Sequence, residues 1–395
     1  MSADLFPKRD SEVLAAVRWA AGEEIPLEII GQGSKRALGR PTQTAHTLDL
    51  SGLTGVTLFE PEELVLSAKA GTPLAGLEKL LDEHNQEFQF EAADLGPLLG
   101  QPAGQGTLGG LVNTNICGPR RLKAGSVRDH ILGVKGVSGR GEEFKSGGRV
   151  VKNVTGYDLS KGVTGSYGTL AVLTDIIMKV LPKAETEQTL VLQGLSDAQA
   201  AEAMAIAMGS NAEVSGAAHL PADIDGKKAQ TLLRLEGFAP SVEYRIANLG
   251  KMLKQFGSRT KLDELTSRSQ WRSIRDCLPF AGGDTPVWRI SCTPSDGHKI
   301  VAALKAECSA RAFYDWQGGL IWLECEDGNA HAVEIRQALA QNGGGHATLI
   351  RADAAMRLNV NVFQPQAAPL AALSKRYKEN FDPKGVLNPG RMGGV

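Results

Sequence analysis

The first periodic segment of the chain predicts a helix over residues 11–21. Its apolar residues recur three and four positions apart, which places them on one helix face: Val13, Leu14, Val17, Ala20 and Ala21. Ser11 is suited to cap the start of this helix, and Gly22 is suited to end it. Residues 25–30 form a short apolar run, so we expect a buried strand that leads into the glycine-rich segment beginning at Gly31.

A second strand is predicted over residues 64–70, and a helix follows it after one glycine. Thr72 fits the N-cap position and Pro73 the first helical position, and the leucines that follow share one face: Leu74, Leu77, Leu80 and Leu81. Over residues 101–182 the apolar runs become short and β-rich, at 131–137 and 169–180, with glycines closely spaced between them. This pattern predicts a sheet with tight turns.

The pattern changes again after Pro182. Beyond Pro182 to Glu185 the chain is rich in alanine, with helical stretches at 197–208 and 242–256 between strands at 231–235 and 320–325. Such a mixture is typical of an α+β domain. Because 395 residues exceed the usual size of one compact domain, we expect two domains, with the boundary near residue 182.

Composition narrows the class of protein. Hydrophobic residues make up 42% of the chain, charged residues 22%, and the net charge is −1, so a charge-driven grip on nucleic acid is excluded. We expect a cytoplasmic protein, since the polar N-terminus lacks a signal sequence and no apolar run reaches membrane-spanning length. None of the five cysteines pairs in a C-x-x-C motif or has zinc-site spacing to a histidine, which predicts reduced thiols and neither a metal site nor an iron–sulfur cluster.

The segment from Gly31 to Gly39 can be interpreted as a nucleotide-binding motif, as another anion-binding loop or as an ordinary surface turn. Glycines after a strand let backbone N–H groups converge on an anion, and Ser34, Lys35 and Arg36 add a hydroxyl and two positive charges. A Rossmann fingerprint would need glycine in place of Arg36 and a long helix afterwards, and a P-loop would need a terminal Gly-Lys-Ser/Thr. Both are absent, so an anion-binding loop of another type and an ordinary surface turn stay open.

Two further glycine clusters favour a ligand. The second spans residues 102–110 and is followed by apolar anchors, and the third spans residues 162–170 and leads into the strand predicted at 169–180. Glycine lets backbone approach a ligand closely. Three such segments in one domain indicate a large, flat, phosphate-bearing ligand held by loops.

In their order along the chain, these segments resemble the FAD domain of the vanillyl-alcohol-oxidase (PCMH-type) flavoproteins. The motifs are GQGSKRALGRP, AGTPLAGLEKLL, PAGQGTLGGLVNTNICGPRR, GSVRDHILGV and KNVTGYDLSKGVTGSYGTLAVLTDI. Within that family the likeness is strongest to glycolate oxidase E subunits, which GGGHATLIRA and FDPKGVLNPGRM also match. The resemblance implies an α+β fold with a PCMH-type FAD-binding domain over 1–182, a cap domain over 183–380 and a tail over 381–395 that returns to the FAD domain.

The resemblance also implies which residues bind FAD. The FAD pyrophosphate would be held by the first loop, Gly31, Gln32, Gly33, Ser34 and Lys35. The ribityl chain and pyrophosphate would be lined by Thr107, Leu108, Gly109 and Gly110, and the isoalloxazine or adenosine end by Gly125, Ser126 and Asp129. The adenine side would be contacted by Gly168, Thr169 and Val172, and the tail would return to the flavin domain with Asn388 and Arg391. Relatives with covalent flavin carry a histidine where Ser34 stands, so FAD is expected to be noncovalent.

Oxidation of a 2-hydroxy acid needs a cation for the carboxylate and a base for the hydroxyl proton. His346, in a glycine-rich stretch, is the candidate base, with an ordinary loop histidine as the alternative. Lys152, Tyr157 and Asp158 flank the third glycine cluster, where a purely structural turn is equally consistent. The basic run Arg120, Arg121 and Lys123 is interpreted as solvated surface, a docking site or an anion site.

One departure from related D-type dehydrogenase subunits affects the predicted role. Their C-terminal domain carries a histidine-rich metal cluster, whereas this chain has no adjacent histidine pair there, so no metal site is expected. The resemblance implies a glycolate oxidase complex containing a second, D-type FAD-binding subunit and an iron–sulfur subunit, with membrane contact only through the complex. The alternatives are a self-sufficient FAD-dependent dehydrogenase of another 2-hydroxy acid and a flavin-free assembly scaffold.

Overall fold

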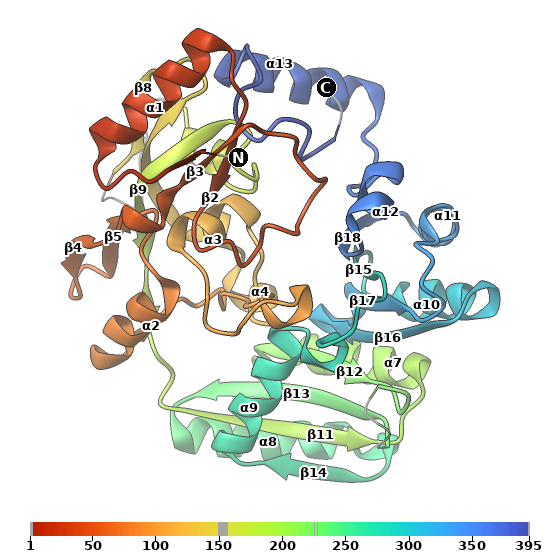
Figure 1. The fold of residues 1–395 in the computed structure, drawn as a ribbon. Coiled ribbons are helices and arrows are strands. Elements are labelled where there is room, and N and C mark those ends of the chain that lie inside the picture. The colour runs from red at the N-terminus through yellow and green to blue at the C-terminus, as the bar shows by residue number, and fades with distance from the viewer. Residues whose placement is uncertain (1–2, 149–156, 225, 227, 394–395) are drawn as a thin grey trace. The chain divides into compact units, whose positions relative to one another are not determined.

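The computed structural model describes residues 3–148, 157–224, 226 and 228–393. The chain forms two compact units. Unit 1 comprises residues 1–117, 125–183 and 365–395, and unit 2 comprises residues 118–124 and 184–364. The chain therefore enters the main part of unit 2 at Ala184 and leaves it after Gln364, whereas the sequence placed the boundaries after residues 182 and 380. Both units combine helices with sheets, which confirms the α+β class (Figure 1).

Unit 1 is built on two main sheets and one small strand pair. A three-stranded parallel sheet has the order β1-β3-β2, and a five-stranded sheet has the order β4-β5-β9-β7-β8. Every pairing within the five-stranded sheet is antiparallel. Short strands β10 and β6 pair separately.

The elements of unit 1 have the following bounds, in chain order: β1 Ala3–Leu5, α1 Asp10–Glu23, β2 Leu27–Ile30, β3 His46–Asp49, β4 Val56–Glu60, β5 Val65–Lys69, α2 Leu74–Glu83, β6 Gln86–Glu87, α3 Leu108–Thr114, α5 Val127–His130, β7 Ile131–Ser138, β8 Glu143–Gly147, α6 Leu159–Val163, β9 Ala171–Lys179, β10 Leu181–Pro182 and α13 Ala368–Phe381.

The core beside the parallel sheet joins distant parts of the chain. The apolar stripe of α1 packs with residues of both sheets and with two residues of the C-terminal segment: Val13, Val17, Ala20, Leu27, Leu48, Val137, Val172, Val386 and Leu387. Leu387 also forms a parallel β-bridge with Leu27 at the start of β2. Burial of these side chains, each worth about 2 kcal/mol, fixes the C-terminal segment beside β2.

Two predicted helix caps are wrong by one or two positions. Helix α1 begins at Asp10, with Arg9 at its N-cap, so Ser11 is already inside the helix. Helix α2 begins at Leu74 with Pro73 at its N-cap. Thr72 has another role, because its Oγ1 accepts a hydrogen bond from the Gly55 backbone N–H at 3.0 Å and thereby joins the strand end to a neighbouring turn.

Unit 2 centres on an eight-stranded sheet with the order β14-β11-β13-β12-β16-β17-β15-β18, in which every neighbouring pair is antiparallel. Its elements are α4 Arg121–Ala124, β11 Thr186–Gln193, α7 Asp197–Met208, β12 Gly216–Leu220, β13 Gln230–Gly237, α8 Ala239–Met252, β14 Arg259–Leu262, α9 Glu264–Arg275, β15 Val287–Ser291, α10 Gly297–Glu307, β16 Ala310–Asp315, β17 Leu320–Cys325, α11 Ala332–Gln341, β18 His346–Arg351 and α12 Ala354–Asn359.

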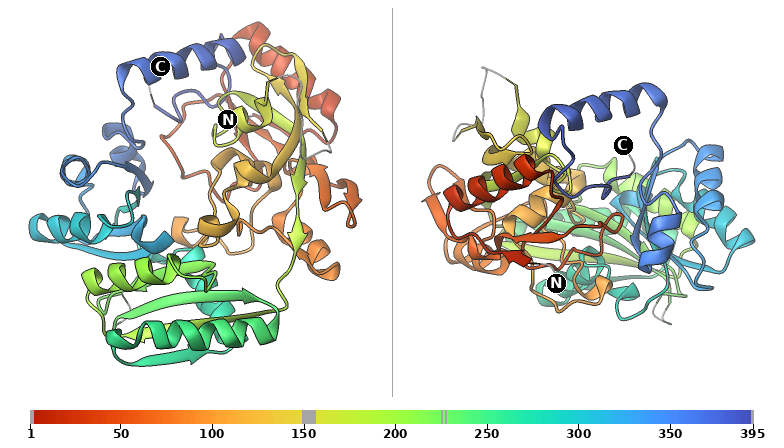
Figure 2. Two further views of the ribbon diagram at one scale, coloured as in Figure 1. Left: turned by 180° about the vertical axis from the view of Figure 1, so that it is seen from behind. Right: turned by 45° about the horizontal axis from the view of Figure 1, so that its top comes forward.

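The two faces of this sheet differ in character. Helices α7 and α8 bury apolar residues against β11 and β13, and α10 and α11 do the same against β15, β16 and β17. Helix α9 lies on the opposite face, where Trp271 Nε1 donates to Thr189 Oγ1 at 2.8 Å and Ser267 Oγ donates to Glu187 at 2.6 Å. Figure 2 shows the elements of this unit from two further sides.

The face that carries α9 also buries an ion pair. Arg120 binds both carboxylate oxygens of Glu236 through Nε, at 2.9 and 3.1 Å, and its Nη2 donates to Oε1 at 2.6 Å. Both side chains are about nine-tenths buried. Arg120 is therefore a structural residue, and its interpretation as solvated or docking surface is wrong. Among the described residues, no helix is long and apolar enough to cross a membrane.

Candidate functional site

The glycine loop after β2 presents consecutive backbone N–H groups. The N–H groups of Gln32, Gly33 and Ser34 meet no hydrogen-bond acceptor among the residues that the structure describes. Gly33 has a φ of 77°, which glycine adopts without strain, and its N–H neighbours form the kind of concave backbone that binds anions. Arg36 N–H donates to Gly33 O at 3.0 Å and closes the turn, so no long helix follows.

The second glycine cluster lies against this loop. Gln32 Oε1 accepts from the Gly106 backbone N–H at 2.8 Å. A Cβ on Gly31 would stand 2.4 Å from Thr107 Oγ1, and one on Gly109 would stand 3.0 Å from Ala70. Thr107 caps α3 by accepting from the Gly110 N–H at 3.2 Å. Glycine is therefore required here because strand, loop and helix approach one another closely.

Asn113 connects the second cluster to the third. Its Nδ2 donates to Gly109 O at 2.9 Å, and its Oδ1 accepts from the Gly168 backbone N–H at 3.1 Å. The Tyr167 N–H donates to Asn113 O at 2.8 Å. One asparagine side chain thus holds two glycine-rich loops together.

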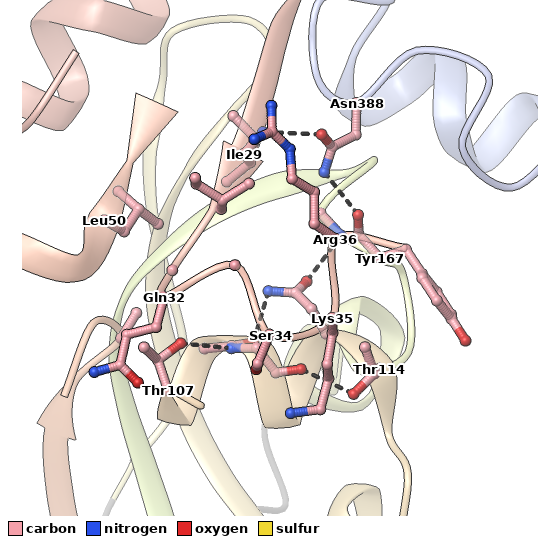
Figure 3. A pocket seen from close by; sticks show the side chains of 18 of the residues that line it. Ile29, Gln32, Ser34, Lys35, Arg36, Leu50, Thr107, Thr114, Tyr167 and Asn388 are labelled. Atoms are coloured by element: carbon pink, nitrogen blue, oxygen red, sulfur yellow. Dashed lines mark hydrogen bonds between the residues drawn. The ribbon is translucent and has the colours of Figure 1, made fainter. Parts of the chain in front are cut away.

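The C-terminal segment completes the site. Asn388 Oδ1 accepts from the Ile29 N–H at 2.8 Å, and its Nδ2 donates to Tyr167 O at 2.8 Å (Figure 3). A Cβ on Gly168, whose φ is 69°, would stand 2.8 Å from Asn388 Nδ2. Asn388 therefore bridges β2 and the third glycine cluster from a segment more than 200 residues further along the chain.

Arg391 fixes the far end of the first loop. Its guanidinium donates to the carbonyl oxygens of Arg36 and Leu38 at 3.1 and 3.0 Å and to Glu28 Oε1 at 3.0 Å. The Glu28 carboxylate is 7% exposed and also binds Arg36 at 2.5 Å. Arg36 and Arg391 therefore share the one buried carboxylate of Glu28 beneath the loop.

These segments line a pocket that is partly open to solvent. Its lining includes most of the predicted FAD contacts: Gly31, Gln32, Gly33, Ser34, Lys35, Thr107, Gly109, Gly110, Gly168, Asn388 and Arg391. The unpaired N–H groups, Lys35 beside them and the glycine-lined walls fit an extended ligand with a pyrophosphate, as FAD has. FAD would rest on the 31–35 loop and the start of α3.

Six predicted contacts are not among the residues that line this pocket. Leu108 and Val172 belong to the buried core, and Thr169 Oγ1 donates to Ser166 O at 2.7 Å. Ser126 and Asp129 form the capping box of α5, in which Asp129 Oδ2 accepts from the Ser126 N–H at 2.7 Å, and Gly125 directly precedes this cap. A role for these six in FAD binding stays a prediction.

The remaining candidates have these positions. His346 is exposed and begins strand β18 in unit 2. Tyr157 is 91% exposed, and Asp158 caps the short helix α6, which agrees with a structural turn. Lys152 lies outside the described residues.

Several lining residues were missed from the sequence. The main ones lie in or beside predicted strands, or directly after a glycine cluster: Ile29, Ile30, Arg36, Leu50, Ala70, Asn113, Thr114, Tyr167 and Leu173. The sequence does contain a signal for Asn113 and Thr114, since both lie one helical turn after glycines at positions 109 and 110. We find no such signal for Leu50 and Leu173.

Comparison with known proteins agrees with this geometry. Residues 1–147 match the family model described as "FAD binding domain". The chain superposes on p-cresol methylhydroxylase with a TM-score of 0.75 at 14% identity, covering 99% of this chain and 88% of that one. It superposes on alkyldihydroxyacetonephosphate synthase with a TM-score of 0.68, covering 98% and 76%. The chain therefore has the fold of these two solved structures, and its first 147 residues match an FAD-binding domain.

Sequence relatives narrow this class. The chain is 35% identical over 383 residues to the glycolate oxidase subunit GlcE of Escherichia coli K12, covering 96% of each protein. It is 25% identical over 236 residues to the glycolate oxidase subunit GlcD of Bacillus subtilis 168, covering 60% of this chain and 47% of that protein. The chain belongs to the family of GlcE-type glycolate oxidase subunits.

FAD is expected to be released intact when the protein is denatured. Of the described residues that line the pocket, none is a histidine or cysteine, and Ser34 occupies the loop position where a flavin-linked histidine would stand. Precipitation with acid should leave all yellow colour in the supernatant. Colour that stays with the washed precipitate would show a covalent bond and contradict this expectation.

Proposed function

We propose that this chain is the FAD-binding subunit of a glycolate oxidase that converts glycolate to glyoxylate. The row of N–H groups at Gln32, Gly33 and Ser34 beside Lys35 supports a bound pyrophosphate cofactor. Kinship to GlcE over almost the whole chain supports the substrate.

The reaction removes two electrons from the substrate. The hydroxyl proton of glycolate leaves to a base, the C2–H bond breaks, and glyoxylate is left with a new C=O double bond. Bound FAD supplies the acceptor for the hydride. The protein's part is to hold the cofactor, fix the carboxylate with a cation and place a base near the hydroxyl.

We also propose how the cofactor contacts divide. Residues 31–35 and 107–110 would hold the pyrophosphate and ribityl chain through backbone N–H groups, and Gly168, Asn388 and Arg391 would close the opposite wall. Since Asn388 and Arg391 bind other parts of the wall through their side chains, their role is to position the loops.

The proposed partners are a second, D-type flavoprotein subunit and an iron–sulfur subunit. The match to both GlcE and GlcD supports a complex of several subunits, and an electron acceptor is needed because FAD must be reoxidised after each turnover. Any membrane association would come through these partners. The glycine-walled pocket speaks against a flavin-free scaffold.

The visible absorption spectrum tests this function. The purified chain should show a flavin spectrum, and anaerobic glycolate should bleach it, either directly or after the partner subunits are added. Bleaching of the isolated chain would make its own flavin the direct oxidant, and bleaching only in the complex would make it an electron relay. A colourless protein, or a flavin that glycolate never reduces even in the complex, would refute the proposal.

A further inference from the structure

The last turn of α13 packs against the third glycine cluster. A Cβ on Gly162 would collide with Tyr377 Oη, so the absence of a side chain at this glycine makes room for the tyrosine. The next residue, Lys378, donates from Nζ to the Thr169 carbonyl oxygen at 2.6 Å. Two neighbouring residues of α13 therefore contact the two ends of this cluster.

The ammonium group of Lys378 is paired with a buried carboxylate. Its Nζ lies 2.5 Å from Asp382 Oδ2, and the Asp382 side chain is fully buried. The same carboxylate accepts from the backbone N–H groups of Val386 at 3.0 Å and Leu387 at 2.9 Å. Lys378 Nζ also donates to Leu387 O at 3.4 Å. The ion pair thus joins the third glycine cluster to the C-terminal segment that runs beside β2.

The turn beside Thr169 is held in a strained conformation. Tyr167 has a φ of 54°, a left-handed backbone that is unfavourable for a bulky side chain. Such a conformation persists only where the surrounding contacts fix it. On one side Asn113 O accepts from the Tyr167 N–H at 2.8 Å, and on the other Asn388 Nδ2 donates to Tyr167 O at 2.8 Å. The bond from Lys378 to Thr169 O is the next anchor of this turn along the chain.

Lys378 itself lies outside the cofactor pocket. Tyr167 and Gly168 line the pocket, whereas neither Lys378 nor Asp382 is among the described residues that do so. Any effect of Lys378 on the fit of the cofactor therefore passes through the turn. Lysine suits this role because its ammonium group presents three hydrogens on one compact head, and three oxygen atoms accept from it here.

We propose that Lys378 is a positioning residue of the FAD site: its bond to Thr169 O keeps the turn that carries Tyr167 and Gly168 in the shape that receives the cofactor. This inference rests on the proposed function, in which Gly168 closes one wall of the pocket. The buried carboxylate of Asp382 aligns the lysine and neutralises its charge. Helix α13 is then part of the cofactor site, although the pocket is lined by other described segments.

Removing the ion pair in two steps separates positioning from stability. K378M leaves the Asp382 carboxylate buried without the ammonium group, so this variant should lose both stability and FAD affinity. K378M/D382N removes both charges, and its urea midpoint should return most of the way to the wild-type value. Its dissociation constant for FAD should stay about ten- to a hundredfold above wild type, the usual effect of one charged hydrogen bond, because Thr169 O still lacks its donor.

The dissociation constant is measured by titrating the flavin-free full chain with FAD and following flavin fluorescence. The matched control is K375M, at an exposed position of the same helix, which should bind FAD within about twofold of the wild type. A K378M/D382N variant that regains wild-type affinity together with its stability would overturn the inference, because Lys378 would then act on stability alone.

Hydrogen–deuterium exchange tests the local effect without any cofactor. In the flavin-free K378M/D382N chain, the amides of residues 167–169 should exchange about tenfold faster than in the wild type, because their turn has lost an anchor. Amides of β5, in the same unit, should exchange at the wild-type rate. Unchanged exchange at residues 167–169 would contradict the proposal, even if the FAD affinity fell.

These outcomes differ from those that test the proposed function, because FAD titration and amide exchange need no glycolate. A flavin that glycolate never reduces would refute the function, while a raised FAD dissociation constant in K378M/D382N would still support the role of Lys378. Glycolate reduction together with wild-type FAD affinity in K378M/D382N would support the function and refute the inference. Should K378M fail to fold, the double variant carries the same test.

Discussion

Replacement of Arg391 by alanine is expected to lower the free energy of unfolding of unit 1 by about 3–5 kcal/mol, the usual cost of breaking a buried ion pair from one side. The Glu28 carboxylate would then depend on Arg36 alone, whose side chain is 58% exposed. The carbonyl oxygens of Arg36 and Leu38 would also lose their donor. Since these residues belong to the glycine loop, bound flavin per chain should fall at least tenfold.

Urea unfolding and the ratio of flavin to protein absorbance measure both effects. The control R376A removes an exposed arginine of α13 and should change the unfolding free energy by less than about 0.5 kcal/mol. Adding E28Q to R391A should recover part of the stability, because the buried negative charge is then gone. A double variant as unstable as R391A would show that the ion pair is not the cause.

A second large loss of stability is expected when Arg120 is replaced by alanine. The alanine variant should destabilise unit 2 by about 3 kcal/mol, since the buried Glu236 carboxylate would lose its bidentate partner and keep Arg234, 3.4 Å away. The control K123A removes a half-exposed lysine whose carboxylate partner, Glu213, is 3.6 Å away, and should have almost no effect.

The Arg120 effect should depend on pH. Burial alone would raise the pKa of Glu236, but the charges of Arg234 and Arg120 outweigh it and lower this pKa to about 2. A carboxyl group whose pKa is lowered by folding stabilises the protein above its unfolded pKa, near 4.5, and this contribution is lost as the pH falls toward 2. The difference between wild type and R120A should therefore be greatest above pH 5 and shrink as the pH falls toward 2. A difference that grows on acidification would contradict this account.

Local periodicity predicted the larger elements well. The helix at 197–208 and the strand at 320–325 have the predicted bounds, because each shows one clear apolar pattern. The predicted cap at Ser11 was wrong because helix α1 already begins at Asp10. The predicted cap at Thr72 was wrong because Thr72 Oγ1 accepts a hydrogen bond from the Gly55 N–H instead, a tertiary contact that no local pattern reveals.

The site was predictable where glycine itself is the requirement. A Cβ on Gly31 would collide with the Thr107 side chain, and one on Gly109 would press against Ala70, so these glycines record in the sequence how closely the segments approach. The burial of Arg120 was not predictable, because its partner Glu236 is 116 residues away.

The position of Asn388 has a consequence for biosynthesis. The wall that Asn388 and Arg391 close is synthesised after residues 184–364 of unit 2, and Asn388 follows its partner Tyr167 by 221 residues. A growing chain therefore carries all three glycine clusters long before its cofactor pocket can be completed, so flavin capture comes late in synthesis. Premature termination before residue 388 would leave a chain with all three glycine clusters and an unfinished cofactor site.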